Sequence, residues 1–165
     1  MLHTSALTLF LDGAPLLTLP PLRVAPGEVL TLMGPSGCGK SSLLAALAGV
    51  LPPGGPIRLT GDILLGAHRL TPLPPQERGV GILFQDDLLF AHLTVAENLM
   101  FGMPAHLKGM AARQTRAHEA LAEVGLEAQA DKLPGALSGG QKARVSLLRA
   151  LLAEPRALLL DEPFS

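Results

Sequence analysis

Continuous apolar runs at three places in the chain predict buried β-strands. The runs cover residues 28–33, 80–84 and 157–160. A strand that is apolar on both sides is typical of a sheet that is covered on both faces. Residues 5–24 mix Leu, Thr and Val with Pro and Gly and predict short, partly exposed strands, and residues 57–65 predict one more strand.

Helical patterns lie between these strands. Residues 41–50 are rich in Ala and Leu and predict a helix that ends at Gly49 or soon after. Residues 94–101 begin with Thr-Val-Ala-Glu, which has the form of a capping box, and predict a short helix. Residues 109–124 predict a further helix that Gly125 ends.

The most regular helical pattern covers residues 138–152. Ser138 and Gln141 stand at capping-box spacing, and Pro155 closes the segment. Its apolar stripe consists of Val145, Leu148 and Leu152. Buried strands that alternate with helices predict an α/β fold with a mostly parallel core sheet.

A glycine-rich turn joins the first apolar run to the first helix. Residues 34–41 read Gly-Pro-Ser-Gly-Cys-Gly-Lys-Ser, which matches the P-loop pattern in full. Its glycines let backbone N–H groups face one anion, and the helix that follows adds the positive end of its dipole. Lys40 is expected to reach the β and γ phosphates, and the Ser41 hydroxyl to ligate Mg²⁺. The predicted phosphate site consists of Gly34, Pro35, Ser36, Gly37, Cys38, Gly39, Lys40, Ser41 and Ser42.

Polar side chains follow two of the predicted strands. Asp161 and Glu162 come directly after residues 157–160, and Gln85 follows residues 80–84. The carboxyl ends of strands in α/β sheets face the ligand. We therefore expect Asp161 and Gln85 to help hold Mg²⁺, and Glu162 and Gln85 to act on the attacking water. Taken alone, an acidic pair also commonly ends a strand without any function, and a glutamine after a strand is usually just solvated.

A second glycine pair starts the helix at residues 138–152. Leu137 is followed by Ser138, Gly139, Gly140 and Gln141, which leaves bare N–H groups beside a serine hydroxyl. Such a helix N-terminus can bind an anion. In isolation the pentapeptide also fits an ordinary capped helix with glycine in its first turn.

These four elements, in this order, resemble the ATP-binding cassette (ABC) ATPases, whose Walker A, Q-loop, LSGGQ and Walker B motifs they match. The resemblance covers nearly the whole chain and implies a P-loop NTPase fold with ATP and Mg²⁺ as ligands. Residues 1 to about 75 would interleave an antiparallel β subdomain with the P-loop core, and about 86–136 would form a helical subdomain. Residues 137–165 would carry the signature helix and the Walker B strand.

The same resemblance implies partners and a location. Ser138, Gly139, Gly140 and Gln141 would contact ATP held by a second ABC subunit, so that ATP joins two subunits head to tail. Roughly fifty residues separate Gln85 from Ser138, too few for the long insertions of chromosome and repair ABC proteins. The sequence 84–95 is similar to thiamine-type importer subunits and closer to their Ynj-type relatives. The resemblance therefore implies membrane permease partners, with the protein peripheral on the cytoplasmic face of the membrane.

Exposed apolar side chains are expected among residues 88–103, where such proteins receive a permease helix, although core packing also explains many of them. The closing Asp-Glu-Pro-Phe-Ser is of the importer form. A soluble ABC protein of translation or repair is the alternative, and an inactive nucleotide-binding fragment is a third interpretation.

Composition narrows the classes further. The net charge is −1 without any block of like charge, so no nucleic-acid partner is expected. Apolar runs such as residues 43–51 reach about half of the ~20 residues that a membrane span needs. The single cysteine, Cys38, fits a reducing compartment.

The chain departs from the family pattern at two places. It ends at Ser165, before the strand that carries the family's switch histidine, so we expect a C-terminally truncated, incomplete fold with negligible ATP turnover by itself. The family stacks an aromatic residue on adenine, and here Phe10 is the candidate, although Phe10 fits a core position beside Leu9 and Leu11 equally well.

Overall fold

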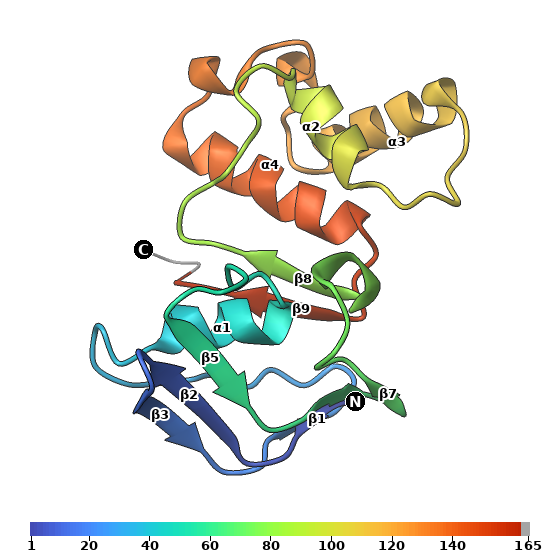
Figure 1. The fold of residues 1–165 in the computed structure, drawn as a ribbon. Helices are drawn as coiled ribbons and strands as arrows, with labels where there is room; N and C mark the ends of the chain where they lie inside the picture. Colours follow the sequence, from blue (N-terminus) through green and yellow to red (C-terminus); the bar gives the residue numbers. More distant parts are fainter. Residues whose placement is uncertain (163–165) are drawn as a thin grey trace. The chain divides into compact units, whose positions relative to one another are not determined.

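The computed structural model describes residues 1–162 and divides the chain into two compact units, Met1–Ile82 and Leu83–Ser165 (Figure 1). Pro163, Phe164 and Ser165, the end of the importer-type sequence, lie outside the described residues.

The first unit contains two small antiparallel sheets. One has the strand order β4-β1-β6-β7 and the other β3-β2-β5, and every strand pair for which the register is known in them is antiparallel. The strands are β1 (Leu2–Thr4), β2 (Leu7–Leu11), β3 (Ala14–Leu19), β4 (Arg23–Val24), β5 (Ile57–Thr60), β6 (Ile63–Leu65) and β7 (His68–Arg69).

The strand predicted at residues 57–65 is two strands that pair in different sheets. They are separated at Gly61, which has φ +104°, and a Cβ at this position would collide with the carbonyl oxygen of Ala6. The chain can make this close approach only with glycine. The prediction for residues 5–24 is confirmed, because β2, β3 and β4 lie there.

The strand predicted at residues 28–33 is wrong. These residues form no strand, and the side chains of Val29 and Met33 are 88% and 93% exposed. A strand exists only when a neighbouring strand completes its hydrogen-bond ladder. None of the described strands pairs with this segment, so its apolar composition alone did not make it a strand.

The helix of the first unit is α1 (Lys40–Ala48), which ends at Gly49 in the left-handed conformation, as predicted. It contacts β5 and contributes Leu43, Ala46 and Leu47 to the core. The buried Arg78 follows a 3₁₀ turn at Pro75–Glu77 and donates to the carbonyl oxygens of Ala46 and Leu47, both at 2.9 Å. Arg78 thus binds carbonyl groups in the last turn of α1, and that of Ala46 also accepts from the Gly49 N–H at 3.1 Å.

The second unit is a small helical assembly. Its helices are α2 (Val95–Gly102), α3 (Met110–Glu123) and α4 (Gly139–Leu152), with 3₁₀ turns at Glu127–Gln129 and Pro134–Ala136. All three helices agree with the predicted ranges to within one or two residues. The capping boxes predicted at Thr94 and Ser138 are both complete.

The core of the second unit is formed by all three helices. The predicted stripe of α4 is buried, with Val145 at 0% and Leu148 and Leu152 at 8% exposure. It packs with Leu99 of α2 and Leu121 of α3, among others. In this unit, the end of β8 (Val80–Leu83) is hydrogen-bonded to β9 (Ala157–Leu160) in a two-stranded sheet, which confirms the other two predicted apolar strands.

Candidate nucleotide-binding site

The P-loop has the backbone conformation that its glycines were expected to supply. Gly37 and Gly39 have φ +78° and +97°, in the left-handed region that residues with a Cβ rarely adopt. Gly39 is the N-cap of α1, and no side chain caps the helix there. The first turn of α1 also contains no acidic residue. The N-terminal N–H groups of α1 and its positive dipole end therefore face an exposed loop.

Lys40 folds back over this loop. Its Nζ donates to the carbonyl oxygens of Gly34 and Pro35, both at 2.9 Å. The ammonium group thus lies beside the same backbone turn whose N–H groups are expected to bind phosphate. This places a full positive charge and the dipole of α1 at one site, which is the electrostatic arrangement that an oligophosphate requires.

Packing restricts the size of the residues in the loop. A Cβ on Gly39 would come within 3.1 Å of the Leu16 side chain, and one on Gly34 would lie 3.0 Å from Cys38 Sγ. Cys38 itself is half-buried, so it fills space beneath the loop. Ser41 is exposed and Ser42 half-buried at the start of α1.

The polar residues after β8 and β9 lie at one end of that strand pair. The Asp161 N–H donates to the carbonyl oxygen of Leu83 at 2.9 Å, which places Asp161 beside the end of β8, two residues before Gln85. Asp161 is 8% exposed, whereas Gln85 and Glu162 are exposed. Glu162 has φ +46°, an unfavourable value for a residue with a side chain. The second unit therefore brings Gln85, Asp161 and Glu162 together, while the P-loop belongs to the first unit.

The side-chain oxygens of Ser41, Gln85, Asp161 and Glu162 are of the kinds that bind Mg²⁺. A hydroxyl, an amide oxygen and carboxylates are the hard oxygen ligands that Mg²⁺ takes, usually with phosphate oxygens and water completing its shell. Within residues 1–162 no three His, Cys, Asp or Glu side chains are grouped to hold a metal by themselves. The chemistry of these side chains therefore fits Mg²⁺.

The signature segment is a capped helix start. Ser138 Oγ accepts from the Gln141 N–H at 3.3 Å, and Gln141 Oε1 accepts from the Ser138 N–H at 2.9 Å. Gly139 and Gly140 are exposed, and a Cβ on either would meet nothing within 4 Å. No contact with the described residues 1–162 therefore requires glycine at these two positions, although glycine weakens a helix.

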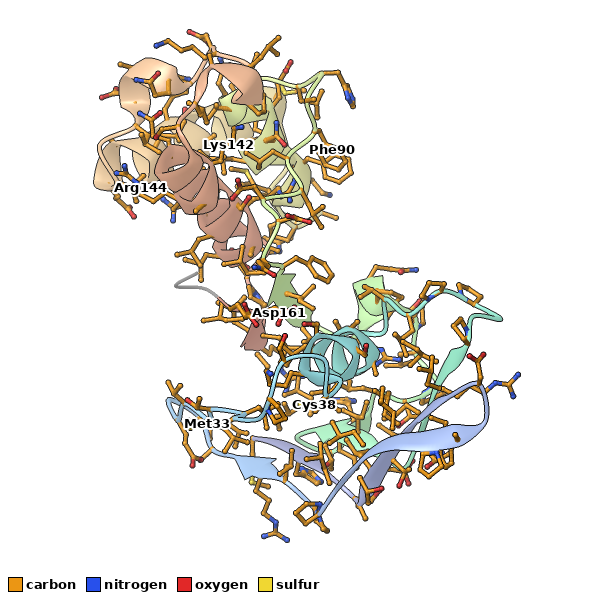
Figure 2. All side chains as sticks on the ribbon, turned by 90° about the vertical axis from the view of Figure 1, so that its left-hand side faces the viewer. Met33, Cys38, Phe90, Lys142, Arg144 and Asp161 are labelled. Carbon is orange, nitrogen blue, oxygen red and sulfur yellow. The ribbon has the colours of Figure 1, made fainter. Side chains whose placement is uncertain are left out.

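Sequence reasoning missed an arginine that supports this segment. Arg144 lies on α4, close to Lys142, in the second unit (Figure 2). Its Nε donates to the carbonyl oxygen of Gly140 at 3.3 Å and its NH1 to that of Val124 at 3.0 Å. The Val124 carbonyl lies at the C-terminal end of α3, so Arg144 ties the first turn of α4 to α3. The sequence gives no signal for this contact, because both acceptors are backbone atoms.

Phe10 has two predicted roles, to stack on adenine or to join the core. It lies in β2 opposite Arg58 of β5 and is half-buried, whereas its neighbour Leu9 is 1% exposed. Alternation along the strand places the two on opposite faces. Phe10 is therefore not part of the core that Leu9 joins, and its role at adenine stays a prediction.

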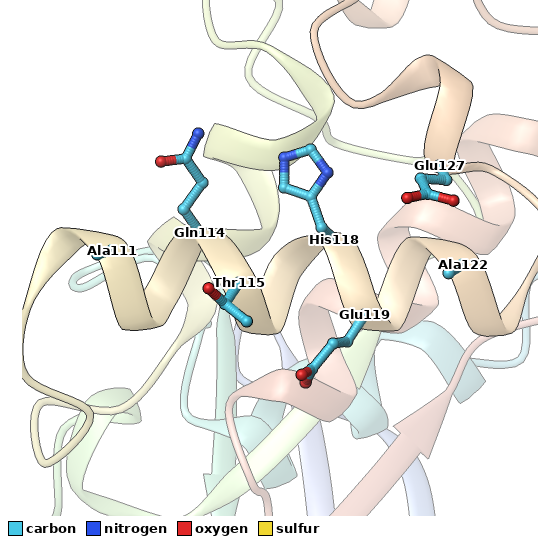
Figure 3. A pocket seen from close by; sticks show the side chains of 7 residues that line it. All are labelled: Ala111, Gln114, Thr115, His118, Glu119, Ala122 and Glu127. Atoms are coloured by element: carbon cyan, nitrogen blue, oxygen red, sulfur yellow. The ribbon is translucent and has the colours of Figure 1, made fainter.

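A shallow pocket elsewhere contains none of the predicted residues. It lies along α3 in the second unit (Figure 3). Its lining consists of Ala111, Gln114, Thr115, His118, Glu119, Ala122 and Glu127. One helix face and a single residue beyond it form this lining, so it encloses little and gives no sign of a ligand.

The fold and these segments define a nucleotide-binding protein of the P-loop class. The ABC transporter family model matches residues 20–165. The chain is 48% identical over 165 residues to the uncharacterized ABC transporter ATP-binding protein YnjD of Escherichia coli strain K12, covering 100% of this chain and 75% of YnjD. It is 47% identical over 145 residues to the Fe(3+) ions import ATP-binding protein FbpC of Brucella abortus, covering 87% of this chain and 39% of FbpC.

A solved structure has the same fold. The ATP-binding cassette MJ0796, solved as a dimer in a post-hydrolysis state bound to ADP and Pi, matches with a TM-score of 0.81 and 28% identity. The match covers 99% of this chain and 75% of that one. The chain therefore belongs to the ABC transporter family of ATP-binding proteins, and its fold is the ABC ATPase P-loop fold with an antiparallel β subdomain.

The chain spans less than two fifths of the length of several import proteins that it matches. One of them is the putative 2-aminoethylphosphonate import ATP-binding protein PhnT of Salmonella typhimurium, which is 45% identical over 144 residues. This match covers 87% of the present chain and 38% of PhnT. Among the helices of residues 1–162, none has the length and apolar character of a membrane span.

Proposed function

We propose that the protein containing this chain binds and hydrolyses ATP to drive solute import through a membrane permease. The observation that carries ATP binding is the start of α1, where Lys40, an uncapped helix N-terminus and an acid-free first turn converge on one exposed loop. The names of several similar proteins, which import ferric ions or 2-aminoethylphosphonate, support the importer role.

The residues of the chain divide the work on ATP by their chemistry. The backbone of residues 34–42 binds the phosphates, and Lys40 neutralises part of their charge. The oxygens of Ser41, Gln85 and Asp161 would hold Mg²⁺, which would supply positive charge to the reacting phosphate. Glu162, exposed at the end of β9, orients the attacking water and accepts its proton, and Gln85 orients the same water. We assign binding to this 165-residue chain and hydrolysis to the whole protein.

A second subunit completes the site. We assign Ser138, Gly139, Gly140 and Gln141 to the ATP held by that partner, in a head-to-tail dimer that ATP joins. The two glycines support this assignment, because no atom of residues 1–162 lies within 4 Å of a Cβ there. An approaching phosphate or backbone from outside the chain supplies the reason for glycine.

An apolar patch in the second unit is the proposed contact with the permease. Leu88 is 57% and Phe101 68% exposed, and the ring of Phe101 packs edge-on against that of Phe90 at 4.6 Å between centroids. Other apolar residues of the segment, including Val95, Leu99 and Met103, are in the core. Large apolar side chains that are this exposed can mark a protein contact. The protein would then sit on the cytoplasmic face of the membrane.

Purification from detergent-solubilised membranes tests the importer role. The tagged whole protein should retain a polytopic membrane protein in a stoichiometric complex. Leu88→Glu and Phe101→Glu should each lose that partner, whereas Met110→Glu, at a residue that is 70% exposed on α3, should keep it. Stoichiometric association with ribosomes or DNA in place of a membrane protein would favour the soluble ABC alternative.

A further inference from the structure

Residues 87–93, which follow Gln85, have no helix or strand, yet side chains of two helices hold their backbone. Ser146 of α4 donates from Oγ to the carbonyl oxygen of Asp87. Arg149 of α4 donates from NH2 to that of Leu88 at 3.0 Å. A loop without regular structure has no ladder of its own, so such side chains decide which conformation it keeps.

Asn98 of α2 is the centre of this network. It is 0% exposed, and its Nδ2 lies within hydrogen-bond distance of the carbonyl oxygens of Phe90, Leu93 and Thr94. Its Oδ1 accepts from the Phe90 N–H at 2.8 Å. A buried amide with its donors and acceptor engaged fixes the surrounding backbone, because each broken contact would leave a polar atom without a partner.

Arg149 links this amide to α4. Its NH1 lies 3.5 Å from Asn98 Oδ1, and its guanidinium carbon lies 5.3 Å from the centroid of the Phe90 ring. These two partners and the Leu88 carbonyl are uncharged. Burial lowers the pKa of Arg149 from its ordinary value, because the charged form loses water around it. The charged side chain thus loses hydration free energy while it holds the loop. A neutral residue would not bear this cost.

The loop is also held in an unfavourable conformation. Leu88 has φ +44° and a side chain that is 57% exposed. A residue with a side chain keeps such a φ only where its surroundings impose it, and this costs of order 1–3 kcal/mol. Here the Arg149 contact to the Leu88 carbonyl is one of the constraints.

We propose that Arg149 is a positioning residue that acts through Asn98 and the Leu88 carbonyl. It fixes Gln85–Phe90, which include the proposed permease contact at Leu88, onto the helix whose N-cap is Ser138. This loop and the signature segment at the start of that helix then move as one body. Arg149 lies on the same helix eleven positions after Ser138, about 16 Å along its axis. A rigid helix can carry a displacement of Leu88 over that distance to Gly139 and Gly140. The effect on turnover rests on the ATPase function proposed above, whereas the effect on the loop does not.

Arg113 provides a matched control. It is an arginine of α3 in the same unit, and it also donates to backbone carbonyl oxygens, including those of Met100 at 2.9 Å and Pro104 at 2.8 Å. No described hydrogen bond joins it to residues 85–90. Arg149→Met and Arg113→Met therefore remove equivalent side chains that differ in what they hold.

The first measurement is hydrogen exchange of the Phe90 amide in the whole protein without nucleotide. Arg149→Met should speed this exchange at least about tenfold, and Arg149→Lys, which keeps the charge and one donor, should speed it less. Arg113→Met should leave it within about twofold. Unchanged exchange in Arg149→Met, or an equal increase in both Met variants, would overturn the proposal. Arg149→Lys carries the same test where Arg149→Met does not fold.

The second measurement is steady-state ATP hydrolysis. We expect Arg149→Met to lower kcat by about tenfold, while the KM for MgATP and the equilibrium affinity for ATP stay within about twofold. A rise in KM with unchanged kcat contradicts a positioning role. A wild-type protein that neither binds nor hydrolyses ATP refutes the proposed function, and the exchange result still decides the positioning of the loop.

Discussion

The helices α1 and α4 both have glycine at their N-terminal ends, but the two ends are built differently. The N-cap of α1 is Gly39, in the left-handed conformation and without a side-chain cap. The N-cap of α4 is Ser138, extended, with both hydrogen bonds of a capping box present. Neither helix has an acidic residue in its first turn.

This difference is compatible with the different tasks proposed for the two ends. At α1 the N-terminal N–H groups have no side-chain cap and Lys40 is close by, so the end is suited to bind an anion by itself. At α4 the Gln141 N–H is already satisfied by Ser138, and the exposed backbone is that of Gly139 and Gly140. The first turn of α4 is therefore capped by its own side chains and offers fewer free N–H groups to an anion. This fits the proposal that it contacts ATP already bound by a second subunit.

The largest effect should come from removing the lysine at α1. Lys40→Ala should weaken ATP binding by roughly 10- to 100-fold, because a charge-assisted contact to phosphate is worth about 1.5–3 kcal/mol. Lys142→Ala, at a lysine in the first turn of α4, should change affinity by less than about twofold. Equilibrium dialysis of labelled ATP checks both, and equal losses in the two variants would remove the distinction between the helix ends.

An intermediate effect should come from adding a methyl group to each helix start. Gly39→Ala should lower the free energy of unfolding by about 1–3 kcal/mol, since its φ is +97° and the new Cβ would crowd Leu16. Gly139→Ala should be neutral or stabilise by up to about 1 kcal/mol, since it removes a glycine from a helix where space is open. Urea unfolding of the whole protein measures both. A strongly destabilised Gly139→Ala would show that the chain itself requires this glycine.

The smallest effect should come from the caps. Ser138→Ala and Thr94→Ala each remove one capping box of nearly the same geometry and should each cost about 1 kcal/mol of stability. Only Ser138→Ala should also lower ATP turnover, because Thr94 starts α2 and has no proposed contact with nucleotide. Thermal unfolding and turnover on the same samples separate the two roles, and a matching loss of turnover in Thr94→Ala would reduce Ser138 to a structural cap.

Local signals in the sequence predicted the helices well. The capping boxes at Thr94 and Ser138 and the stop at Gly49 depend on neighbours within four residues, so they are visible in the chain itself. The strand at residues 28–33 failed because a strand depends on a partner that its own sequence does not specify. The break between two strands at Gly61 could not be predicted from neighbouring residues. The atom that excludes a Cβ there is the carbonyl oxygen of Ala6, far away along the chain.

The candidate site shows the same difference between local sequence signals and contacts of distant residues. The P-loop, the signature and Asp161 are contiguous motifs and could be located by their spacing. The support of the loop at residues 87–93 could not, because Arg149 reaches residues 51 and 61 positions away and binds one of them through a carbonyl oxygen. Backbone acceptors carry no sequence pattern, so only the structure reveals such contacts.

The most direct test of the account mixes two variants of the whole protein, Lys40→Ala and Gly140→Asp. The first lacks a working P-loop. The second places an acid at the start of α4, where the helix dipole favours it but a partner's phosphate does not. Each alone should hydrolyse ATP near background. The mixture should recover up to about a quarter of the wild-type rate, because half of randomly formed dimers are mixed and each contains one intact site of two. A mixture that gives only the average of the two separate rates would contradict a site shared between two copies of this chain.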